Sequence, residues 1–457
     1  MSMLLGAFQL LNPNGTVGVS WRHPDNTSLD YLSIDYWTGI ARILEDSGFD
    51  FLFFADSYGY PTTADGSTIA QGLIDATNVP LADPITVVSA VAAATDHLGI
   101  VVTSSTTIER PAALARRYGT LDHLTDGRIG WNIVTGGHES SAALMGEAQT
   151  PHDMRYAIAD DHVAICLKLW EGSWADDALV ADKEGGVYAD PTKVRQISHE
   201  GEHLSAKGLF GVPPSPQRTP LLVQAGSSPA GKELAAKYAE IVFIGGGDDV
   251  EKVKSHIADI RAKLVANGRG ADAIKFVVGV SVLLGADQAE AERKRAQMLE
   301  FATLEQAATN FTWLTGFDIA AYPMDEPLPD LESEQGQSLI EALLNPGTGP
   351  RKTPRQVITD YRDKGHFGQM YVGTGEQVAT ELEAYQAATG LDGFLIQPHI
   401  TPGTYQDIAD YLAPVLRERG LIGAAEGDTL RARIFPATGD RLPAPHVADS
   451  YRFRSEA

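Results

Sequence analysis

Short apolar runs alternate with longer amphipathic segments along most of this chain. Eight of the runs have the length and composition of buried strands; they are residues 3–8, 51–55, 98–104, 129–134, 220–223, 241–244, 274–284 and 393–397. Helical spacing marks residues 34–47, 85–95, 112–124, 156–170, 230–239, 250–266, 288–303, 376–388 and 405–418, the last kinked by Pro414. Eight strand–helix units predict an α/β fold with a parallel sheet, closed as a (β/α)8 TIM barrel. An open, doubly wound sheet is the alternative, but no Gly-x-Gly-x-x-Gly follows the first run.

Two segments and the carboxyl-terminal tail interrupt this rhythm. Residues 171–219 are polar and rich in turn formers, and residues 304–367 contain many prolines. Segments of this length in a compact domain usually carry function or small elements of their own, so we expect both as insertions over the C-terminal mouth of the barrel. Residues 420–457 are expected to wrap the surface or a neighbouring subunit. The whole chain, 1–457, is therefore interpreted as one barrel domain with two insertions and a tail.

Composition limits the partners. The net charge of −24, from 60 acidic and 36 basic residues, argues against nucleic acid and anionic membranes. No basic, signal-like start and no membrane-length apolar run is present in the sequence. The single cysteine, Cys166, excludes internal disulfides and suits a buried position in a reducing cytoplasm. We therefore expect a cytoplasmic protein with no membrane or nucleic-acid partner.

Candidate chemistry lies at the ends of the predicted strands, where TIM barrels carry their active sites. Phe8 ends the first run, Asp56 follows the second, and Thr103 lies in the third. Core packing, a helix cap and strand packing are the respective structural alternatives. Asn132 interrupts the apolar fourth run, and a buried amide costs about 1–3 kcal/mol unless it finds partners. Asn132 is therefore a candidate functional residue.

The fifth run leads into Gln224-Ala225-Gly226-Ser227-Ser228-Pro229 and then a helix. Free N–H groups at a helix N-terminus, with Ser227 and Ser228 beside them, suit an anion, although an ordinary N-cap is the structural alternative. His152 and Tyr156 are four residues apart, so they share a helix face and can contact the same ligand. A single terminal phosphate on a barrel predicts a mononucleotide such as FMN.

Metal and hydrolytic chemistry have little support. The chain has no His-Glu-x-x-His, no Gly-x-Ser-x-Gly and no Walker loop. His138 with Glu139, and His199, Glu200 and His203, are possible ligands. We expect structural or solvent-exposed roles for them and predict no metal site.

Three motifs occur in order: Trp131-Asn132-Ile133-Val134-Thr135, His152-x-x-Arg155-Tyr156 and Gln224-Ala225-Gly226-x-Ser228. With them the chain resembles the bacterial-luciferase-like flavin monooxygenases, and within these the nitrilotriacetate and dibenzothiophene-sulfone monooxygenase branch. The resemblance extends from the first strand to about Leu421.

The resemblance implies a two-component enzyme that takes FMNH2 from a separate NAD(P)H:flavin reductase and transfers one oxygen atom from O2 to a small organic substrate. It implies FMN contacts from Asp56, Thr103, Asn132, His152, Tyr156, Ser227 and Ser228. Thr103 and Asn132 are the implied catalytic residues, shaping an O2 pocket beside flavin N5. This favours a flavin-N5-peroxide as the oxidant and leaves a C4a-peroxide open.

The substrate pocket departs from that of the resembled family. Dibenzothiophene-sulfone relatives carry histidines where this chain has residues 14–20 and Leu314. Trp313 and Leu314, with Phe8, make an apolar wall, which predicts an aromatic, organosulfur or halogenated substrate that is oxygenated and cleaved. A deazaflavin-dependent dehydrogenase and a non-catalytic flavin-binding protein are the alternatives. A homo-oligomer, dimer or tetramer, is also expected.

Overall fold

The computed structural model describes residues 2–14, 20–63, 65–245, 249–331, 334, 336–344, 350–364, 369–423 and 426–454. Its centre is a barrel of parallel strands: β1 (Leu4–Leu10), β2 (Phe51–Ala55), β3 (Gly99–Ser105), β4 (Ile129–Val134), β9 (Leu221–Gln224), β10 (Ile241–Ile244), β11 (Lys275–Leu284) and β13 (Gly393–Gln397). β10 pairs with β9 and β11, and β13 pairs with β11 and β1, so the sheet closes on itself. The predicted TIM barrel is confirmed, and the open sheet is excluded.

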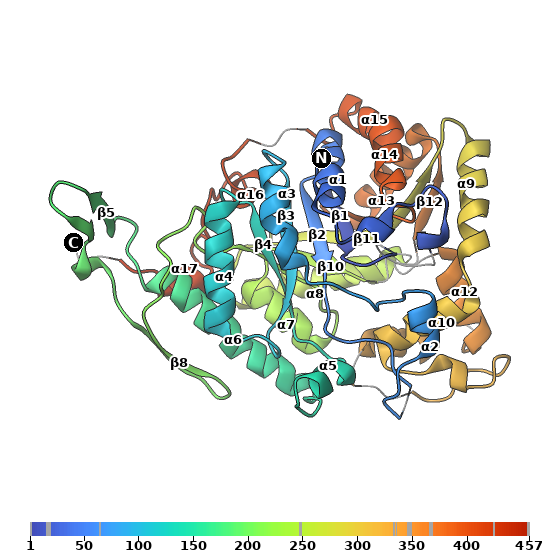
Figure 1. Cartoon of the computed structure of the whole chain (residues 1–457), viewed down its shortest axis with the longest axis horizontal. Coiled ribbons are helices and arrows are strands. Elements are labelled where there is room, and N and C mark those ends of the chain that lie inside the picture. The colour runs from blue at the N-terminus through green and yellow to red at the C-terminus, as the bar shows by residue number, and fades with distance from the viewer. Residues whose placement is uncertain are drawn as a thin grey trace.

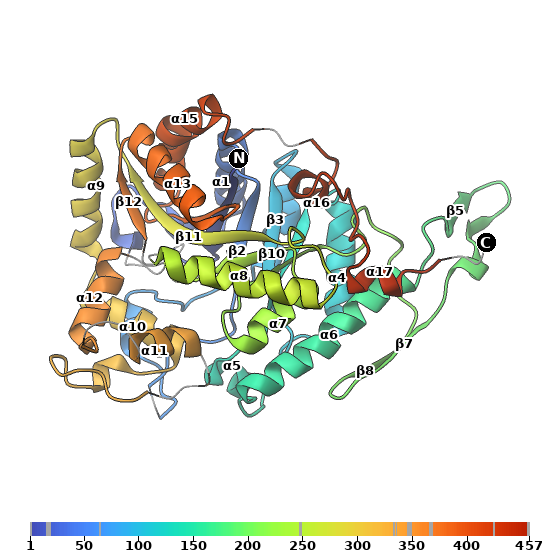
Figure 2. The same ribbon diagram turned by 180° about the vertical axis from the view of Figure 1, so that it is seen from behind.

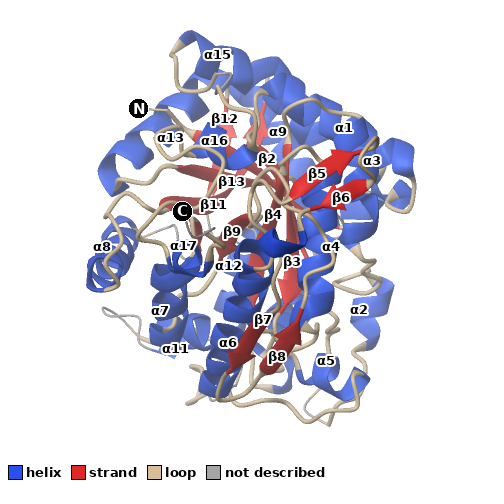
Figure 3. Cartoon of the chain, turned by 90° about the vertical axis from the view of Figure 1, so that its left-hand side faces the viewer, coloured by secondary structure: helices blue, strands red, loops and turns tan. Residues whose placement is uncertain are grey.

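Helices surround the barrel (Figures 1–3). They are α1 (Ile34–Ser47), α3 (Val88–Ala93), α4 (Pro111–Leu124), α6 (His152–Gly172), α7 (Pro229–Tyr238), α8 (Val250–Ala266), α9 (Gln288–Phe301), α13 (Gly375–Thr389), α14 (Gly403–Asp407) and α15 (Ala413–Glu418). A π-helical segment, η6 (Ile408–Leu412), separates α14 from α15 immediately before Pro414. Proline has no N–H to donate to the preceding turn, so the regular α-helical hydrogen bonding is interrupted next to Pro414, where the sequence predicts a kink.

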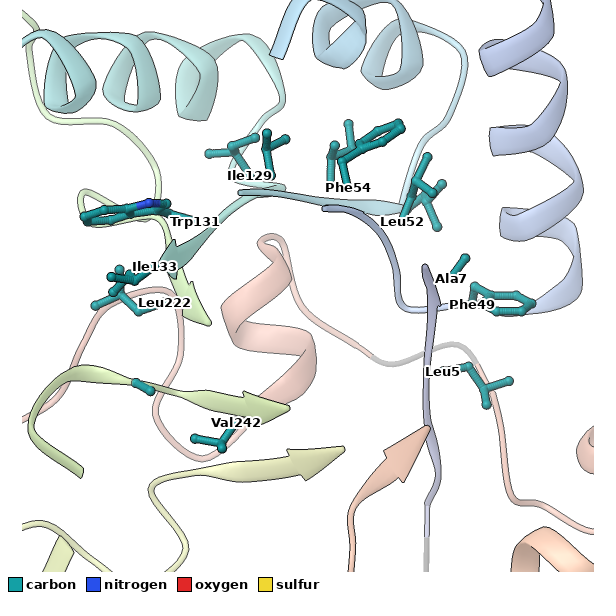
Figure 4. Packing of buried hydrophobic residues seen from close by; sticks show 14 of the residues in the cluster. Leu5, Ala7, Phe49, Leu52, Phe54, Ile129, Trp131, Ile133, Leu222 and Val242 are labelled. Carbon is teal, nitrogen blue, oxygen red and sulfur yellow. The ribbon is translucent and has the colours of Figure 1, made fainter. Parts of the chain in front are cut away.

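Alternation along the strands produces two apolar layers. Outward side chains such as Leu5, Leu52 and Trp131 pack under the helices, and Figure 4 shows them pointing away from the strand ring. Inward side chains, among them Phe53 and Val101, fill the interior. The same alternation determines which polar residues face the barrel interior.

Part of the tail lies inside the barrel, rather than on the surface as expected. Leu430 and Ile434 of α16 (Leu430–Ile434) belong to the interior cluster. The buried guanidinium of Arg431 donates to both carboxylate oxygens of Glu240 at 2.6 and 2.9 Å. Glu240 immediately precedes β10, so α16 plugs the amino end of the barrel. The tail continues to α17 (Val447–Tyr451), which packs on α6.

The two insertions take different positions. The first forms the hairpins β5 (Leu179–Asp182)–β6 (Val187–Ala189) and β7 (Ile197–Glu200)–β8 (Ser205–Gly208). It leaves the end of α6 and returns at the start of β9, so it flanks α6, and β5 projects from the body in Figure 1. The expected cover over the mouth therefore holds only for the second insertion.

The second insertion contains α10 (Leu304–Thr315), α11 (Gln337–Leu344) and α12 (Pro354–Lys364), which share a small core of their own. α10 packs on α2 (Ala70–Ile74), in the connection after β2, so this insertion lies at the carboxyl ends of the strands. An unpredicted strand, β12 (Met370–Gly373), pairs with the last residues of β11. The remaining short elements are α5 (Glu139–Leu144), η1 (Ser20–Arg22), η2 (Ser28–Asp30), η3 (Pro84–Val87), η4 (Pro191–Lys193) and η5 (Ile319–Ala321). Within the described ranges, no helix combines the length and apolar character needed to cross a bilayer.

Candidate active site

Thr103 and Asn132 form a buried polar pair inside the barrel. They are partners in the β3–β4 register, and the Asn132 amide donates to the Thr103 hydroxyl at 2.9 Å. That hydroxyl in turn donates to the Phe54 carbonyl at 2.8 Å. Asn132 Oδ1 has no hydrogen-bond partner among the described residues, although Asn132 is only 3% exposed. The predicted buried amide is thus held in one orientation and presents a free acceptor to a ligand.

Asp56 follows β2 and is half-buried. Burial raises the pKa of its carboxyl to about 7, and the nearby Asp83 and Glu109 carboxylates add to the shift. The Ser57 N–H donates to it at 2.9 Å and opposes that shift. A carboxyl group with this pKa is partly protonated near neutral pH, which is unusual for an aspartate and typical of functional sites.

The N-terminus of α7 combines a helix cap with a tight backbone cradle. Ser228 Oγ accepts a hydrogen bond from the Gly231 N–H at 3.1 Å, so Ser228 is the N-cap of α7, as the structural alternative predicts. The hydroxyl hydrogen of Ser228 remains available to donate, so capping and anion binding are compatible. A Cβ on Gly226 would lie 3.0 Å from Gly231 Cα, and Ser227 is exposed. The loop is therefore compact, with Ser227 exposed and Ser228 half-buried at the start of α7.

The first turn of α6 meets this cradle. A Cβ placed on Gly231 would lie 3.1 Å from the Tyr156 hydroxyl. The His152 and Tyr156 rings are 5.0 Å apart. The structure therefore brings together Ser228, Tyr156 and His152, three residues predicted separately from the sequence.

The second insertion contacts the same turn of α6. The His152 N–H donates to the Glu334 carboxylate at 2.8 Å, and Arg155 donates to the Glu334 carbonyl at 2.6 Å. These contacts tie the insertion to the mouth.

Trp313 and Phe8, two of the residues predicted to make an apolar wall, each stack on another ring. Trp313 of α10 stacks on His138 with ring centroids 5.0 Å apart and an interplanar angle of 21°. Trp313 Nε1 donates to the Gly59 carbonyl at 3.4 Å. Phe8 stacks on Phe53 in the barrel interior at 5.7 Å. The two residues therefore belong to separate aromatic pairs, and a common wall stays a prediction.

His138 is expected from the sequence to have a structural or solvent-exposed role rather than to bind a metal, and its stacking on Trp313 is a structural contact whose partner the sequence does not identify. Burial and the nearby Arg155 lower its pKa to about 4, so its imidazole is neutral at pH 7. Leu314, the other predicted wall residue of α10, is half-buried. Of residues 14–20, the loop in which the chain departs from the resembled family, residues 15–19 lie outside the described residues, and buried Asn14 donates to the Asp75 carbonyl at 2.8 Å.

Two further polar residues with buried, unpartnered atoms were missed by sequence reasoning. Ser281 lies in β11 and Gln397 ends β13. Ser281 interrupts an apolar run, which is the signal that identified Asn132, whereas Gln397 ends one. The same criterion applied to every predicted strand therefore points to Ser281 but not to Gln397.

The other ligand candidates have structural partners. His199 Nε2 donates to the Asp161 carboxylate at 3.1 Å, and the His203 N–H donates to the same carboxylate at 2.7 Å. They fix the β7–β8 turn against α6. Within the described ranges, no three potential metal ligands gather. Cys166 is buried in α6, as expected, with its thiol 3.4 Å from the Pro111 carbonyl.

Comparison with known proteins decides the family. The luciferase-like monooxygenase model matches residues 16–420. The chain belongs to this family. It is therefore a flavin-dependent monooxygenase, as predicted, and the proposed resemblance is confirmed.

Three relatives span almost the whole chain. Dimethyl-sulfide monooxygenase of Hyphomicrobium sulfonivorans is 38% identical, covering 98% of this chain and 94% of the relative. Nitrilotriacetate monooxygenase component A of Aminobacter aminovorans is 34% identical, covering 90% and 92%. A riboflavin lyase solved with modified FMN and its substrate riboflavin is 37% identical, with a TM-score of 0.92, covering 99% of this chain and 100% of the other. These names cover chemically different substrates, so the family alone does not select one.

Proposed function

We propose that this protein is the oxygenase of a two-component system. It takes FMNH2 from a separate NAD(P)H:flavin reductase and uses O2 to oxygenate and cleave a small organic substrate. The observation that carries the proposal is that α6 and α7 converge after β9, the strand that pairs with β4, and that β4 carries a buried amide whose acceptor is unpaired. A relative named as component A and one solved with modified FMN support it.

The cradle at α7 fits the FMN phosphate. Its N-terminal N–H groups and helix dipole favour an anion, and the closeness of Gly226 and Gly231 leaves no room for side chains there. Ser227 and Ser228 would donate their hydroxyl hydrogens to the phosphate. Tyr156 and His152 would contact the phosphate or the ribityl chain. Helix N-termini and hydroxyl groups would bind the phosphate without a covalent bond, which suits a flavin that binds and dissociates.

The polar pair and Asp56 fit the ring system. Asn132 Oδ1 would accept a hydrogen bond from a flavin N–H. The Thr103 hydroxyl accepts a hydrogen bond from the same amide and so fixes its orientation. Asp56 would contact the flavin from the end of β2. Bound FMNH2 supplies the electrons that activate O2, and we propose N5 rather than C4a as its reacting position, following the family resemblance.

The aromatic wall suits an uncharged substrate. Trp313 and Leu314 from α10, with Phe8 from β1, would contact it, and neutral His138 supports the Trp313 ring. We propose an apolar aromatic, organosulfur or halogenated substrate. The dimethyl-sulfide relative is an example of organosulfur chemistry on a similar chain.

The test is turnover under ¹⁸O2. The protein is combined with a generic flavin reductase, NADH and FMN, and screened against organosulfur, haloaromatic and heterocyclic compounds. One ¹⁸O atom in a product that forms only with both proteins supports the proposal. Oxidation of an alcohol with a deazaflavin cofactor and no need for O2 contradicts it.

A further inference from the structure

Ser281 and Gln397 form a second polar pair inside the barrel. They are register partners on β11 and β13, and both are 0% exposed. Neither the Ser281 hydroxyl nor either polar atom of the Gln397 amide has a hydrogen-bond partner among the described residues. The pair is thus buried and entirely unsatisfied.

Strand alternation directs both side chains inward. Val277 of β11 and Leu395 of β13 belong to the interior cluster. Ser281 lies four residues after Val277 and Gln397 two after Leu395, so both face the same interior. In the ring order, β11 and β13 lie opposite β3 and β4, which carry the Thr103–Asn132 pair.

Fold stability does not explain these residues. A buried amide without partners destabilises a protein, and an apolar side chain at position 397 would avoid that cost. Gln9 provides a contrast on the neighbouring strand β1: it is equally buried, but its amide donates to the Tyr405 hydroxyl at 3.1 Å. Gln397 lacks even that contact, which indicates a partner that arrives from outside the chain.

The donor and acceptor pattern specifies the partner. A glutamine amide offers one acceptor and two N–H donors, and a serine hydroxyl can do both. Neither group is charged, so the pair complements a neutral edge in which a carbonyl adjoins an N–H. Amides, lactams and imides have this edge.

We propose that Ser281 and Gln397 bind a neutral carbonyl–N–H edge in the mouth of the barrel. The inference deepens the proposed function, because the same interior would hold flavin and substrate. The edge has two possible sources: the pyrimidine ring of the flavin, or an amide, lactam or imide group on the substrate.

The experiment compares ligands that differ only by a methyl group on that nitrogen. One arm measures the affinity of FMN and of 3-methyl-FMN. The second measures phthalimide and N-methylphthalimide on both FMN-saturated and flavin-free protein. In wild type we expect the N–H form to bind about tenfold more tightly in one arm, the ratio expected for one hydrogen bond. Gln397→Leu should abolish that preference and raise the Tm of the ligand-free protein, and Ser281→Ala should reduce the preference. Gln9→Leu is the matched control and should retain it.

Preference in the FMN arm assigns the edge to the flavin, and preference in the phthalimide arm assigns it to the substrate. No preference in either arm overturns the inference, as does a preference that survives Gln397→Leu. A ligand-free Gln397→Leu protein with a lower Tm also overturns it, because that would show a structural role. If the wild-type protein does not bind FMN, the proposed function is contradicted. The flavin-free phthalimide arm still tests the Ser281–Gln397 pair in that case.

Discussion

Individual residues in this protein often serve the fold and the site together. Ser228 caps α7 through its oxygen and has its hydrogen left for a ligand, so the cap that the structure shows is compatible with the proposed phosphate contact. Asn132 shows the reverse: the fold satisfies its amide N–H and leaves its oxygen unpaired. Unpaired atoms therefore indicate function better than polarity alone.

Replacing Ser228 by alanine should affect both binding and stability. FMNH2 affinity should fall by about 1–3 kcal/mol with the lost hydrogen bond. Loss of the cap should lower the free energy of unfolding by about 1 kcal/mol. Ser227→Ala is the matched control for stability alone, since Ser227 is exposed and is not the N-cap, and it should lower FMNH2 affinity without lowering the free energy of unfolding. Anaerobic flavin titration and urea unfolding measure the two effects, and unchanged affinity in Ser228→Ala would remove the phosphate assignment.

Asn132→Ala should impair oxygen transfer more than flavin binding. Thr103 fixes the orientation of the amide, and in the proposed site the amide would contact the ring system of the flavin, whereas the serines of α7 would bind its phosphate. Product formation per FMNH2 consumed and the Kd for FMNH2 give the two quantities. Equal losses in both would indicate a merely structural amide.

Asp56→Asn should change the pH dependence of stability. The native pKa of about 7 lies above the unfolded value near 4, so the native state binds more protons between these values. The wild type therefore loses stability as pH rises from about 4 to 7, and the asparagine variant lacks that loss. The difference in unfolding free energy should grow in favour of the variant over this range and level off above it. A difference that is constant from pH 4 to 8 would contradict the raised pKa.

At the scale of elements, local pattern predicted the barrel because each strand and helix carries its own period. The eight predicted strands and the nine predicted helical segments are all present, since apolar runs and helical spacing depend on neighbours in sequence. The strand β12 and the helices α10, α11 and α12 of the second insertion were not predicted. The place of α16 was missed because Leu430 and Ile434 look like any amphipathic turn, and only long-range closure shows that they fill the barrel.

The same limit applies to the site. Asn132, Ser228, Tyr156 and His152 lie in motifs that the sequence displays. The stacking of His138 on Trp313 joins residues far apart in the chain, so it needed the structure. Gln397 and Ser281 were visible as polar residues in apolar runs, but their lack of partners was not.

The plug formed by α16 yields a stability prediction. Arg431→Met leaves the Glu240 carboxylate buried without its partner and should cost about 3–5 kcal/mol. The double variant Arg431→Met/Glu240→Gln should recover much of this loss. Arg433→Met, on the same helix but only half-buried, is the control. Urea unfolding followed by circular dichroism measures each, and equal losses in Arg431→Met and Arg433→Met would contradict a buried plug.

At the scale of the whole molecule, the two barrel ends have separate tasks. The tail closes the amino end with an apolar helix and a buried ion pair. The second insertion covers the carboxyl end and is tied to α6 through Glu334. The α7 cradle, the Thr103–Asn132 pair and the Trp313–His138 stack all lie at that covered end. The architecture thus concentrates every candidate for chemistry at one mouth.

The central claim is that this mouth binds FMNH2 and controls its reaction with O2. The direct measurement is stopped-flow mixing of the protein and photoreduced FMN with oxygenated buffer, followed by flavin absorbance. We expect FMNH2 bound to the protein to reoxidise with kinetics different from those of free FMNH2, and the difference should diminish in Ser228→Ala at limiting flavin. Flavin that reoxidises as it does free in solution, with no oxygenated product from any compound screened, would contradict it.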